Sequence, residues 1–207
     1  MNSKPYDVVL LPDDNIVGKS IELSQKLSNR GVRFTLGNRL YFSHVSVYML
    51  QLDNIGLEKA TRLVQQLSTV VSEISARASE YHYFEGYLDI EYEKSAEISF
   101  LQEEIIKLLN PIRDGLREKD KERLATADEM TRNNIIKYGY RSVGESFYPH
   151  LTFTRFIKTD SQEEIMAALP DKAVFNGKFT GIGIFEIGDN GTCIKLVSEW
   201  PLKKLQD

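Results

Sequence analysis

The order of apolar and polar positions predicts short strands that alternate with amphipathic helices. Residues 6–11 form a short, mostly apolar run that indicates a buried strand, and the helix expected after it closes at Gly31. Residues 40–50 change to a period of two, which predicts a second strand. Apolar side chains at spacings of three and four predict a helix over residues 57–74, and alternation returns over residues 83–92.

The second half of the chain begins with a long helical pattern. It starts near Ser95, and Asn110-Pro111 interrupts it, so we expect a kink or break there. The mixed charges of residues 119–123 are typical of a solvated helix face. The remaining elements are predicted as a strand at 149–156, a short helix at 162–169, and three strands within 173–202 that include a hairpin turn at 189–191.

The same order of elements occurs twice. His44-x-Ser46 on a strand is followed by a helix and then by Phe84-Glu85-Gly86. His150-x-Thr152 on a strand is followed by a helix and then by Phe175-Asn176-Gly177. This repetition indicates an internal repeat, although coincidence stays open because strand–helix–strand order is common.

Composition and charge exclude several classes of protein. The chain has 207 residues, 42% of them hydrophobic and 27% charged, with a formal net charge of −4. These values are typical of a globular domain, and the slightly acidic balance argues against broad nucleic-acid binding by counterion release. The single cysteine, Cys193, excludes an internal disulfide. We expect neither a signal peptide nor a membrane helix, and therefore a cytoplasmic protein.

Two of the three histidines lie in the same local pattern. His44-Val45-Ser46-Val47 and His150-Leu151-Thr152-Phe153 each place a hydroxyl two residues after the imidazole. Since residues i and i+2 of a strand project from one face, each imidazole is expected to lie beside its hydroxyl. One such histidine alone is more simply a packed strand residue, but the matched pair indicates a functional site. His82 lacks the hydroxyl, and we interpret it as structural.

The pair provides what cleavage of a phosphodiester without a metal requires. One neutral imidazole can take a proton from the attacking water, and one imidazolium can give a proton to the leaving oxygen. The Ser46 and Thr152 hydroxyls can donate to phosphate oxygens, and Arg155 is the nearest candidate cation. Strict alternation puts Arg155 on the face away from His150, so a twist or bulge is needed to bring it to the phosphate. We expect no metal and no cofactor, because no histidine spacing typical of a metal site occurs.

The motifs HVSV and HLTF resemble the paired H-x-S/T-hydrophobic motifs of the two-histidine (2H) phosphoesterase superfamily. That superfamily includes bacterial 2′-5′ RNA ligase-like proteins and cyclic nucleotide phosphodiesterases. The resemblance covers most of the chain. It implies an α+β fold with two pseudo-symmetric lobes, each an antiparallel sheet with outer helices, and an active-site cleft between them. Residues 1–207 are then expected to form one two-lobed domain.

The resemblance also implies roles for particular residues. His44 and His150 correspond to the acid–base pair, and Ser46 and Thr152 to the phosphate ligands. Some members continue as H-x-T-x-x-R, and Arg155 stands at that position. The motifs lie farther apart here than in compact bacterial members, and a helical insertion at about 95–138 accounts for most of the excess. The insertion is most simply extra packing, although a lid, a substrate-selecting wall or a partner surface stays open.

Two aromatic residues are candidates for stacking on a base. Tyr48 is expected to share the face of His44 and Ser46, and Tyr140 lies shortly before the second motif. Packing in the core or at the rim of the site is the alternative for both.

The expected function is metal-independent hydrolysis of a 2′,3′-cyclic phosphate on a nucleotide or RNA end. We expect His150 to activate water and His44 to protonate the departing ribose oxygen, with the reverse allocation open. A 2′-5′ RNA ligase or 2′-5′ phosphodiesterase on the same scaffold is one alternative. A non-catalytic module that binds a nucleotide or phosphate is another. We expect no membrane association and no obligate protein partner, and a monomer.

Overall fold

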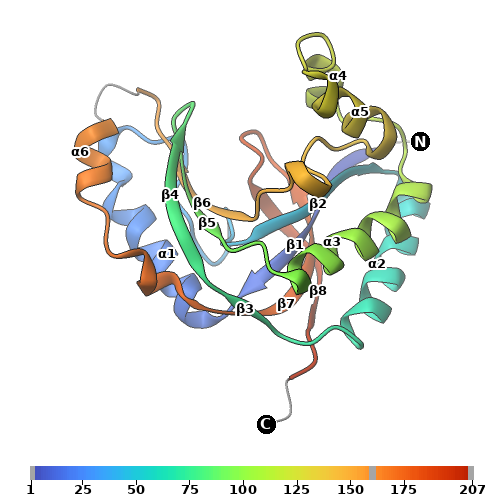
Figure 1. Ribbon diagram of the computed structural model, residues 1–207, viewed down its shortest axis with the longest axis horizontal. Helices are drawn as coiled ribbons and strands as arrows, with labels where there is room; N and C mark the ends of the chain where they lie inside the picture. Colours follow the sequence, from blue (N-terminus) through green and yellow to red (C-terminus); the bar gives the residue numbers. More distant parts are fainter. Residues whose placement is uncertain (1–2, 159–161, 205–207) are drawn as a thin grey trace.

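The computed structural model describes residues 3–158 and 162–204, which form two antiparallel sheets (Figure 1). The first sheet has the order β2-β1-β7-β3, with β8 also paired to β7, and the second has the order β4-β5-β6. The strands are β1 (Lys4–Pro12), β2 (Val45–Leu52), β3 (Ile74–Ala76), β4 (Ala78–Phe84), β5 (Tyr87–Tyr92), β6 (His150–Arg155), β7 (Gly177–Ile187) and β8 (Cys193–Pro201).

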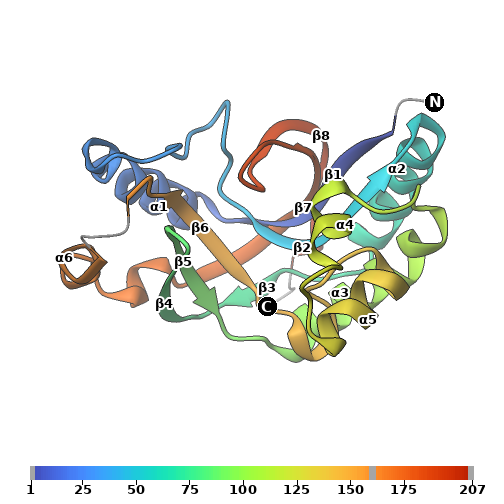
Figure 2. The same cartoon turned by 90° about the horizontal axis from the view of Figure 1, so that it is seen from above.

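Helices cover the outer side of each sheet (Figures 1 and 2). Helix α1 contacts β6 of the three-stranded sheet, whereas α2 contacts β2, β7 and β8, and α3 contacts β2, of the five-stranded sheet. The α-helices are α1 (Asp14–Lys26), α2 (Asn54–Ser68), α3 (Ala96–Leu109), α4 (Glu118–Arg123), α5 (Glu129–Tyr138) and α6 (Gln162–Ala167). The short 3₁₀ turns are Ser28–Arg30, Asn110–Ile112, Gly144–Ser146 and Lys172–Phe175. The architecture is the α+β arrangement of two antiparallel sheets with outer helices that the resemblance to the 2H phosphoesterases implied.

The two sheets share one hydrophobic core. Val8 and Leu10 of β1 belong to the same buried cluster as Ile90 of β5 and Phe153 of β6. A smaller cluster on the opposite face of the five-stranded sheet contains Val9, Phe185 and Cys193. Because the larger cluster draws on both sheets, the relative placement of the lobes is stabilised by burial of apolar surface.

Local signals in the sequence account for several element boundaries. The Asp13 carboxylate accepts a hydrogen bond from Ile16 N at 3.0 Å and begins α1 after the buried strand β1. The Ser95 hydroxyl accepts from Ile98 N at 3.3 Å and begins α3. Helix α3 ends before Pro111, which lies in a 3₁₀ turn, so the predicted break is confirmed.

The helix predicted over residues 57–74 ends earlier than expected. Helix α2 stops at Ser68, and Ile74 pairs with Phe179 of β7 as the first residue of β3. The apolar spacing continues beyond Ser68, but pairing with a strand from the far end of the chain determines the conformation. The strand predicted at 40–50 likewise begins only at Val45, so His44 lies immediately before β2.

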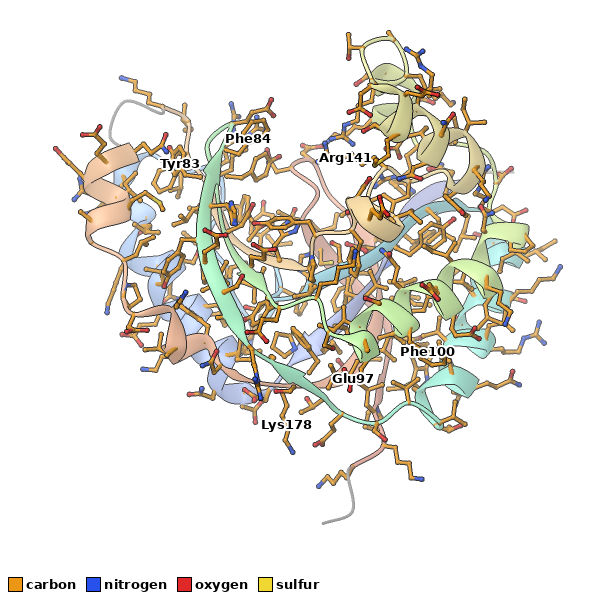
Figure 3. The ribbon with its side chains drawn as sticks, in the orientation of Figure 1. Tyr83, Phe84, Glu97, Phe100, Arg141 and Lys178 are labelled. Atoms are coloured by element: carbon orange, nitrogen blue, oxygen red, sulfur yellow. The ribbon has the colours of Figure 1, made fainter. Side chains whose placement is uncertain are left out.

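The strand predicted at 83–92 is interrupted by a hairpin turn. Glu85 and Gly86 have φ angles of 51° and 83° and connect β4 to β5. A Cβ at Gly86 would lie 2.7 Å from the carbonyl oxygen of Phe156, so the position requires glycine. Phe84 lies at the hairpin tip with 70% of its surface exposed (Figure 3).

Two further expectations, one on the internal repeat and one on residues 173–202, were wrong. Phe84-Glu85-Gly86 forms a hairpin turn, whereas Phe175-Asn176-Gly177 leads from a 3₁₀ turn into β7, so these segments are not structurally equivalent. Residues 173–202 form two long strands after a 3₁₀ turn and not three strands. The turn predicted at 189–191 does join β7 to β8, with Gly191 at φ 73°.

The segment predicted as a helical insertion, residues 95–138 and called the insertion below, contains α3, α4 and α5. Helix α3 packs on β2 and α2, while the charged helix α4 is mostly exposed. Asp120 of α4 is the exception, because it is buried between Arg117, at 2.6 Å, and Arg123, at 3.4 Å. None of the helices in the described part of the chain has the length and apolar composition needed to cross a membrane.

Candidate active site

The two predicted histidines have the same hydrogen-bonding geometry. His44 Nδ1 lies 2.7 Å from the carbonyl oxygen of Phe42, and His150 Nδ1 lies 2.7 Å from that of Tyr148. Since a carbonyl oxygen only accepts, Nδ1 must carry the proton in both rings. In the neutral ring, this tautomer leaves the Nε2 lone pair of each histidine available for proton transfer.

A β-bulge follows each motif at the same position. The register between β1 and β2 shifts at Val47, and the register between β5 and β6 shifts at Phe153; each residue lies three positions after its histidine. A bulge adds one residue to one strand, so the side chains beyond it change face. The bulges are therefore a second feature that the two halves of the site share.

The second bulge brings Arg155 to the face of Thr152. Thr152 pairs with Asp89 and Arg155 pairs with Tyr87, and Asp89 and Tyr87 lie on one face of β5. The Arg155 guanidinium lies 4.6 Å from the Tyr87 ring centre and donates to the Asn190 side chain at 3.1 Å. The bulge needed for Arg155 to reach the second motif is present.

We call the sheet faces that carry the hydroxyls of Ser46 and Thr152 the motif faces.

The first bulge has the opposite consequence for Tyr48, and the expectation of base stacking there was wrong. Tyr48 pairs with Val8 on the face opposite Ser46, is fully buried, and donates its hydroxyl to Tyr138 O at 2.6 Å. Tyr140 is 6% exposed and packs edge-on against Tyr48, with ring centres 6.0 Å apart. Both tyrosines are core residues because the bulge and the insertion enclose them.

The two imidazoles lie within electrostatic range of each other. His44 has a side chain only 12% exposed, and burial lowers its pKa to about 4, with a smaller contribution in the same direction from the charge of His150. His44 is therefore neutral at physiological pH. His82, the third histidine, hydrogen-bonds Glu91 at 3.1 Å and packs edge-on against Tyr148, which itself stacks on His150.

A buried aspartate that the sequence reasoning missed lies beside each motif, on the strand that pairs with the motif strand. Asp7 of β1 is fully buried, and its Oδ2 accepts a hydrogen bond from Ser46 Oγ at 2.6 Å. Asp89 of β5 is 8% exposed and pairs with Thr152 of β6, so the two side chains lie on the same face. A signal for the first was present in the sequence, since Asp7 interrupts an otherwise apolar strand and a buried charge requires a reason.

The insertion contributes one more residue that sequence reasoning missed. The Arg117 guanidinium contacts Met49 Sδ at 2.8 Å and lies 5.4 Å from the Tyr140 ring centre. Met49 pairs with Asp7 on the motif face of the five-stranded sheet. Each motif therefore has an arginine close by, Arg155 from β6 itself and Arg117 from the insertion.

A cavity of about 640 Å³ opens beside Arg155. Asn190, which accepts the hydrogen bond from Arg155, forms part of its wall, as do Arg33 and Tyr41. Neither motif histidine lines this cavity. Tyr41 has a φ of 57°, an uncommon conformation for a residue other than glycine.

One group of side chains has the spacing of a metal site but not the chemistry of one. Donor atoms of Asp7, His44 and Cys193 lie within 4.8 Å of one another. Burial raises the pKa of the Cys193 thiol well above its ordinary value, so it stays protonated, and a thiol binds metals far less well than a thiolate. Asp7 already accepts the Ser46 hydroxyl. Glu80, His82 and Glu91 form a second close group, in which the hydrogen bond between His82 and Glu91 accounts for the contact.

The fold is that of LigT-like 2H phosphoesterases. A Thermus thermophilus structure, TT0787, matches with a TM-score of 0.61 and 13% identity over 98% of this chain and 100% of that chain. Apo LigT from E. coli matches at 0.60 and 9% identity, over 98% and 99% of the two chains. A structure described as a phosphoesterase matches at 0.62 and 8% identity, also over 98% and 99%. At identities this low, the structural similarity establishes the fold and nothing more specific.

A match to a sequence family shows which family this chain belongs to. Residues 54–178, more than half of the chain, match the model of the family described as "Protein of unknown function (DUF1045)". The chain belongs to that family. The matched region contains the second motif but begins after the first one. No curated protein matches the sequence.

Proposed function

We propose that this protein is a metal-independent phosphodiesterase that hydrolyses a 2′,3′-cyclic phosphate on a nucleotide or RNA end. The observation that carries the proposal is the matched pair of imidazoles, each held by its Nδ1 with Nε2 left for proton transfer. Acid–base catalysis of this reaction needs two such groups, one on each side of the scissile bond. A module that only binds phosphate has no need of two proton-transfer groups.

The protonation of His44 favours one allocation of roles. His44 is neutral because burial lowers its pKa to about 4, so its Nε2 can accept a proton from the attacking water. His150 then acts as the acid and protonates the departing ribose oxygen. This allocation is the reverse of the one expected from the sequence, in which desolvation of His44 could not be taken into account.

The phosphate is held by groups on the two motif faces. Ser46 and Thr152 present hydroxyls to its non-bridging oxygens, and Arg155 offsets the charge that develops on them. The Arg155 side chain is suited to this role because stacking on Tyr87 orients its planar guanidinium.

The rest of the substrate extends into the cavity beside Arg155. E. coli LigT has been crystallised with phosphate, with 3′-AMP and with ATP, so that relative binds small nucleotides. Here the cavity wall includes Tyr41 and Arg33, an aromatic ring and a cation that suit a nucleoside. The stacking role expected of Tyr48 and Tyr140 passes in this proposal to Tyr41.

The test is a substrate screen in EDTA-treated buffer. The panel contains the four nucleoside 2′,3′-cyclic phosphates, RNA ends with a cyclic phosphate, and linear 2′-5′ dinucleotides, with product analysis for ligation as well as hydrolysis. We expect turnover of a cyclic phosphate that EDTA does not abolish. Turnover of only the linear 2′-5′ compounds would move the assignment to a 2′-5′ phosphodiesterase, and ligated products would move it to a ligase. Nucleotide binding without turnover of any compound would contradict an enzymatic function.

Removing the Arg155 guanidinium is expected to weaken substrate binding. Arg155→Ala should raise KM for the cyclic phosphate by about 10–100-fold, since a hydrogen bond to a charged group contributes about 1.5–3 kcal/mol. Arg155→Lys should recover only part of this, because lysine lacks the planar, stacked donor pair. The matched control is Arg62→Ala, which removes the same charge from the exposed face of α2. Equal KM values for Arg155→Ala and Arg62→Ala would remove Arg155 from the site.

A further inference from the structure

Each half of the site has one buried aspartate on its motif face, at different register positions: Asp7 pairs with Met49, and Asp89 pairs with Thr152. Asp7 lies on the strand paired with β2 and Asp89 on the strand paired with β6. Asp7 Oδ2 accepts a hydrogen bond from the Ser46 hydroxyl at 2.6 Å, and Asp89 lies directly opposite Thr152 with its side chain on the same face. In both carboxyl groups the second oxygen, Oδ1, is buried and has no hydrogen-bond partner among residues 3–158 and 162–204. Two buried carboxyl groups, each beside a motif hydroxyl and each with an unpaired oxygen, require a physical reason.

The contact creates a conflict over a single proton. A hydroxyl has one hydrogen to donate. If Asp7 is a carboxylate, it uses the Ser46 hydrogen and leaves only oxygen lone pairs toward a phosphate, which repel the anion. If Asp7 is protonated, it donates to Ser46 Oγ, and the hydroxyl can turn its own hydrogen to the phosphate. The same alternatives hold for Asp89 and Thr152.

We propose that Asp7 and Asp89 are positioning residues that act in their neutral, protonated form, so that binding of the phosphate anion is coupled to proton uptake by these two carboxyl groups. Each acid donates to its hydroxyl, and the hydroxyl donates to a non-bridging phosphate oxygen. The proposal rests on the proposed phosphoester site but assigns a role to residues outside both motifs. It also explains the buried Oδ1 atoms, since a carbonyl oxygen without a partner costs less than a carboxylate oxygen without one.

The surroundings of both carboxyl groups favour the protonated form. Burial raises the pKa of Asp7 to about 7, although the Ser46 hydrogen bond and the Arg117 charge oppose this. The other titratable groups that face Asp7 are His44, whose Nε2 lies 3.9 Å from its Oδ2, Tyr140, and the Cys193 thiol.

Asp89 has the corresponding surroundings in the second sheet. Burial raises its pKa, against the opposing effects of His150, Thr152 and His82. Tyr148 also faces it. An anion bound beside either group raises its pKa further, which is the physical basis of the coupling.

The experiment counts protons taken up on anion binding, with sulfate as the probe because it does not titrate near neutral pH. Calorimetric titrations at about pH 8, in buffers of different ionisation enthalpy, compare the wild type with the double variant Asp7→Asn, Asp89→Asn. The amide of Asn donates to the hydroxyl as the protonated acid does, but it cannot take up a proton. We expect the double variant to bind sulfate as tightly as the wild type or more tightly, with about one to two fewer protons taken up.

Three further comparisons separate this role from a purely structural one. Asp7→Ala, which leaves Ser46 without a donor, should bind sulfate about 10-fold more weakly, while Asp7→Asn does not. For the cyclic phosphate, KM of the wild type should rise by up to about tenfold per pH unit above the pKa of Asp7, and the rise should be smaller in the double variant. Asp14→Asn, an equal charge change at an exposed residue of α1, should leave the proton count unchanged.

The outcomes are distinguishable from failure of the proposed enzymatic function. Equal proton uptake by the wild type and the double variant would overturn the role of the aspartates, whether or not the protein turns over a cyclic phosphate. Absence of sulfate binding would also overturn it, because the hydroxyls would then donate to no anion. Coupled uptake without turnover of any cyclic phosphate would contradict the phosphodiesterase function and support the positioning role.

Discussion

Replacing His44 or His150 with Ala is expected to lower kcat for the cyclic phosphate by about 10²–10⁴-fold, the usual contribution of one general acid or base. The kcat values of the two single variants should be similar. Because the two imidazoles act in one proton-transfer step, the double variant should be little slower than the slower single variant. Steady-state kinetics on the best substrate of the screen provides the measurement. Unchanged turnover in both single variants would remove the proposed mechanism.

The pH dependence and chemical rescue check the same assignment. In the wild type, kcat/KM should fall as pH decreases through about 4, because protonation of His44 removes the lone pair that accepts the water proton. This limb should be absent from the residual activity of His44→Ala. Added imidazole should restore part of the activity of either variant, and thermal unfolding of the variants provides the control for folding. An acid limb that persists in His44→Ala would assign the base to another group.

Replacing Asp7 with Asn is expected to stabilise the protein at alkaline pH. Burial raises the pKa of Asp7 from its ordinary value of 3.8 to about 7, so the folded state binds this proton more tightly than the unfolded state does. The protonated carboxyl therefore contributes stability that is complete below about pH 3.8 and is lost as pH rises through about 7. At pH 8 the ionised, buried carboxylate costs about 3–5 kcal/mol, and Asp7→Asn removes this cost.

Urea unfolding at several pH values measures the effect. The variant should exceed the wild type in free energy of unfolding at pH 8, and the difference should shrink toward zero as pH approaches 4. His44 has the opposite dependence, because burial lowers its pKa. Its neutral form contributes stability that is complete above about pH 6.5 and is lost as pH falls through about 4. Asp14→Asn, at an exposed position, provides the control for the charge change. A difference that does not vary with pH would show that Asp7 is ionised in the folded protein at every pH studied.

Much of the fold could be predicted because its signals are local. The buried strand β1, the Asp13 cap and the break at Pro111 depend on residues that are neighbours in the chain. The boundary errors have a different origin. Apolar residues beyond Ser68 fit a longer helix, and only pairing of Ile74 with β7 places them elsewhere. In the same way, alternation continued through Glu85-Gly86 and concealed the hairpin turn.

In the candidate site, too, the features that depend on neighbouring residues could be predicted and those that depend on strand pairing could not. His44, Ser46, His150 and Thr152 could be selected from the sequence, because the spacing of imidazole and hydroxyl on a strand is a local property that the chain repeats. The bulges at Val47 and Phe153 could not be located from the sequence, since a bulge is defined by the pairing with the partner strand. These bulges bury Tyr48 and bring Arg155 to the motif face.

By itself, then, the amino-acid sequence determined most of the strands and helices and selected the four candidate side chains of the twin motifs, and the resemblance of those motifs to a family implied the outer helices. Tertiary structure alone decided which strands became partners, and through them the contacts of Asp7, Asp89 and Arg117 with the site. It also decided that His44 is neutral. The reason is that periodicity and capping act between residues a few positions apart, whereas desolvation and strand pairing depend on atoms brought together from distant parts of the chain.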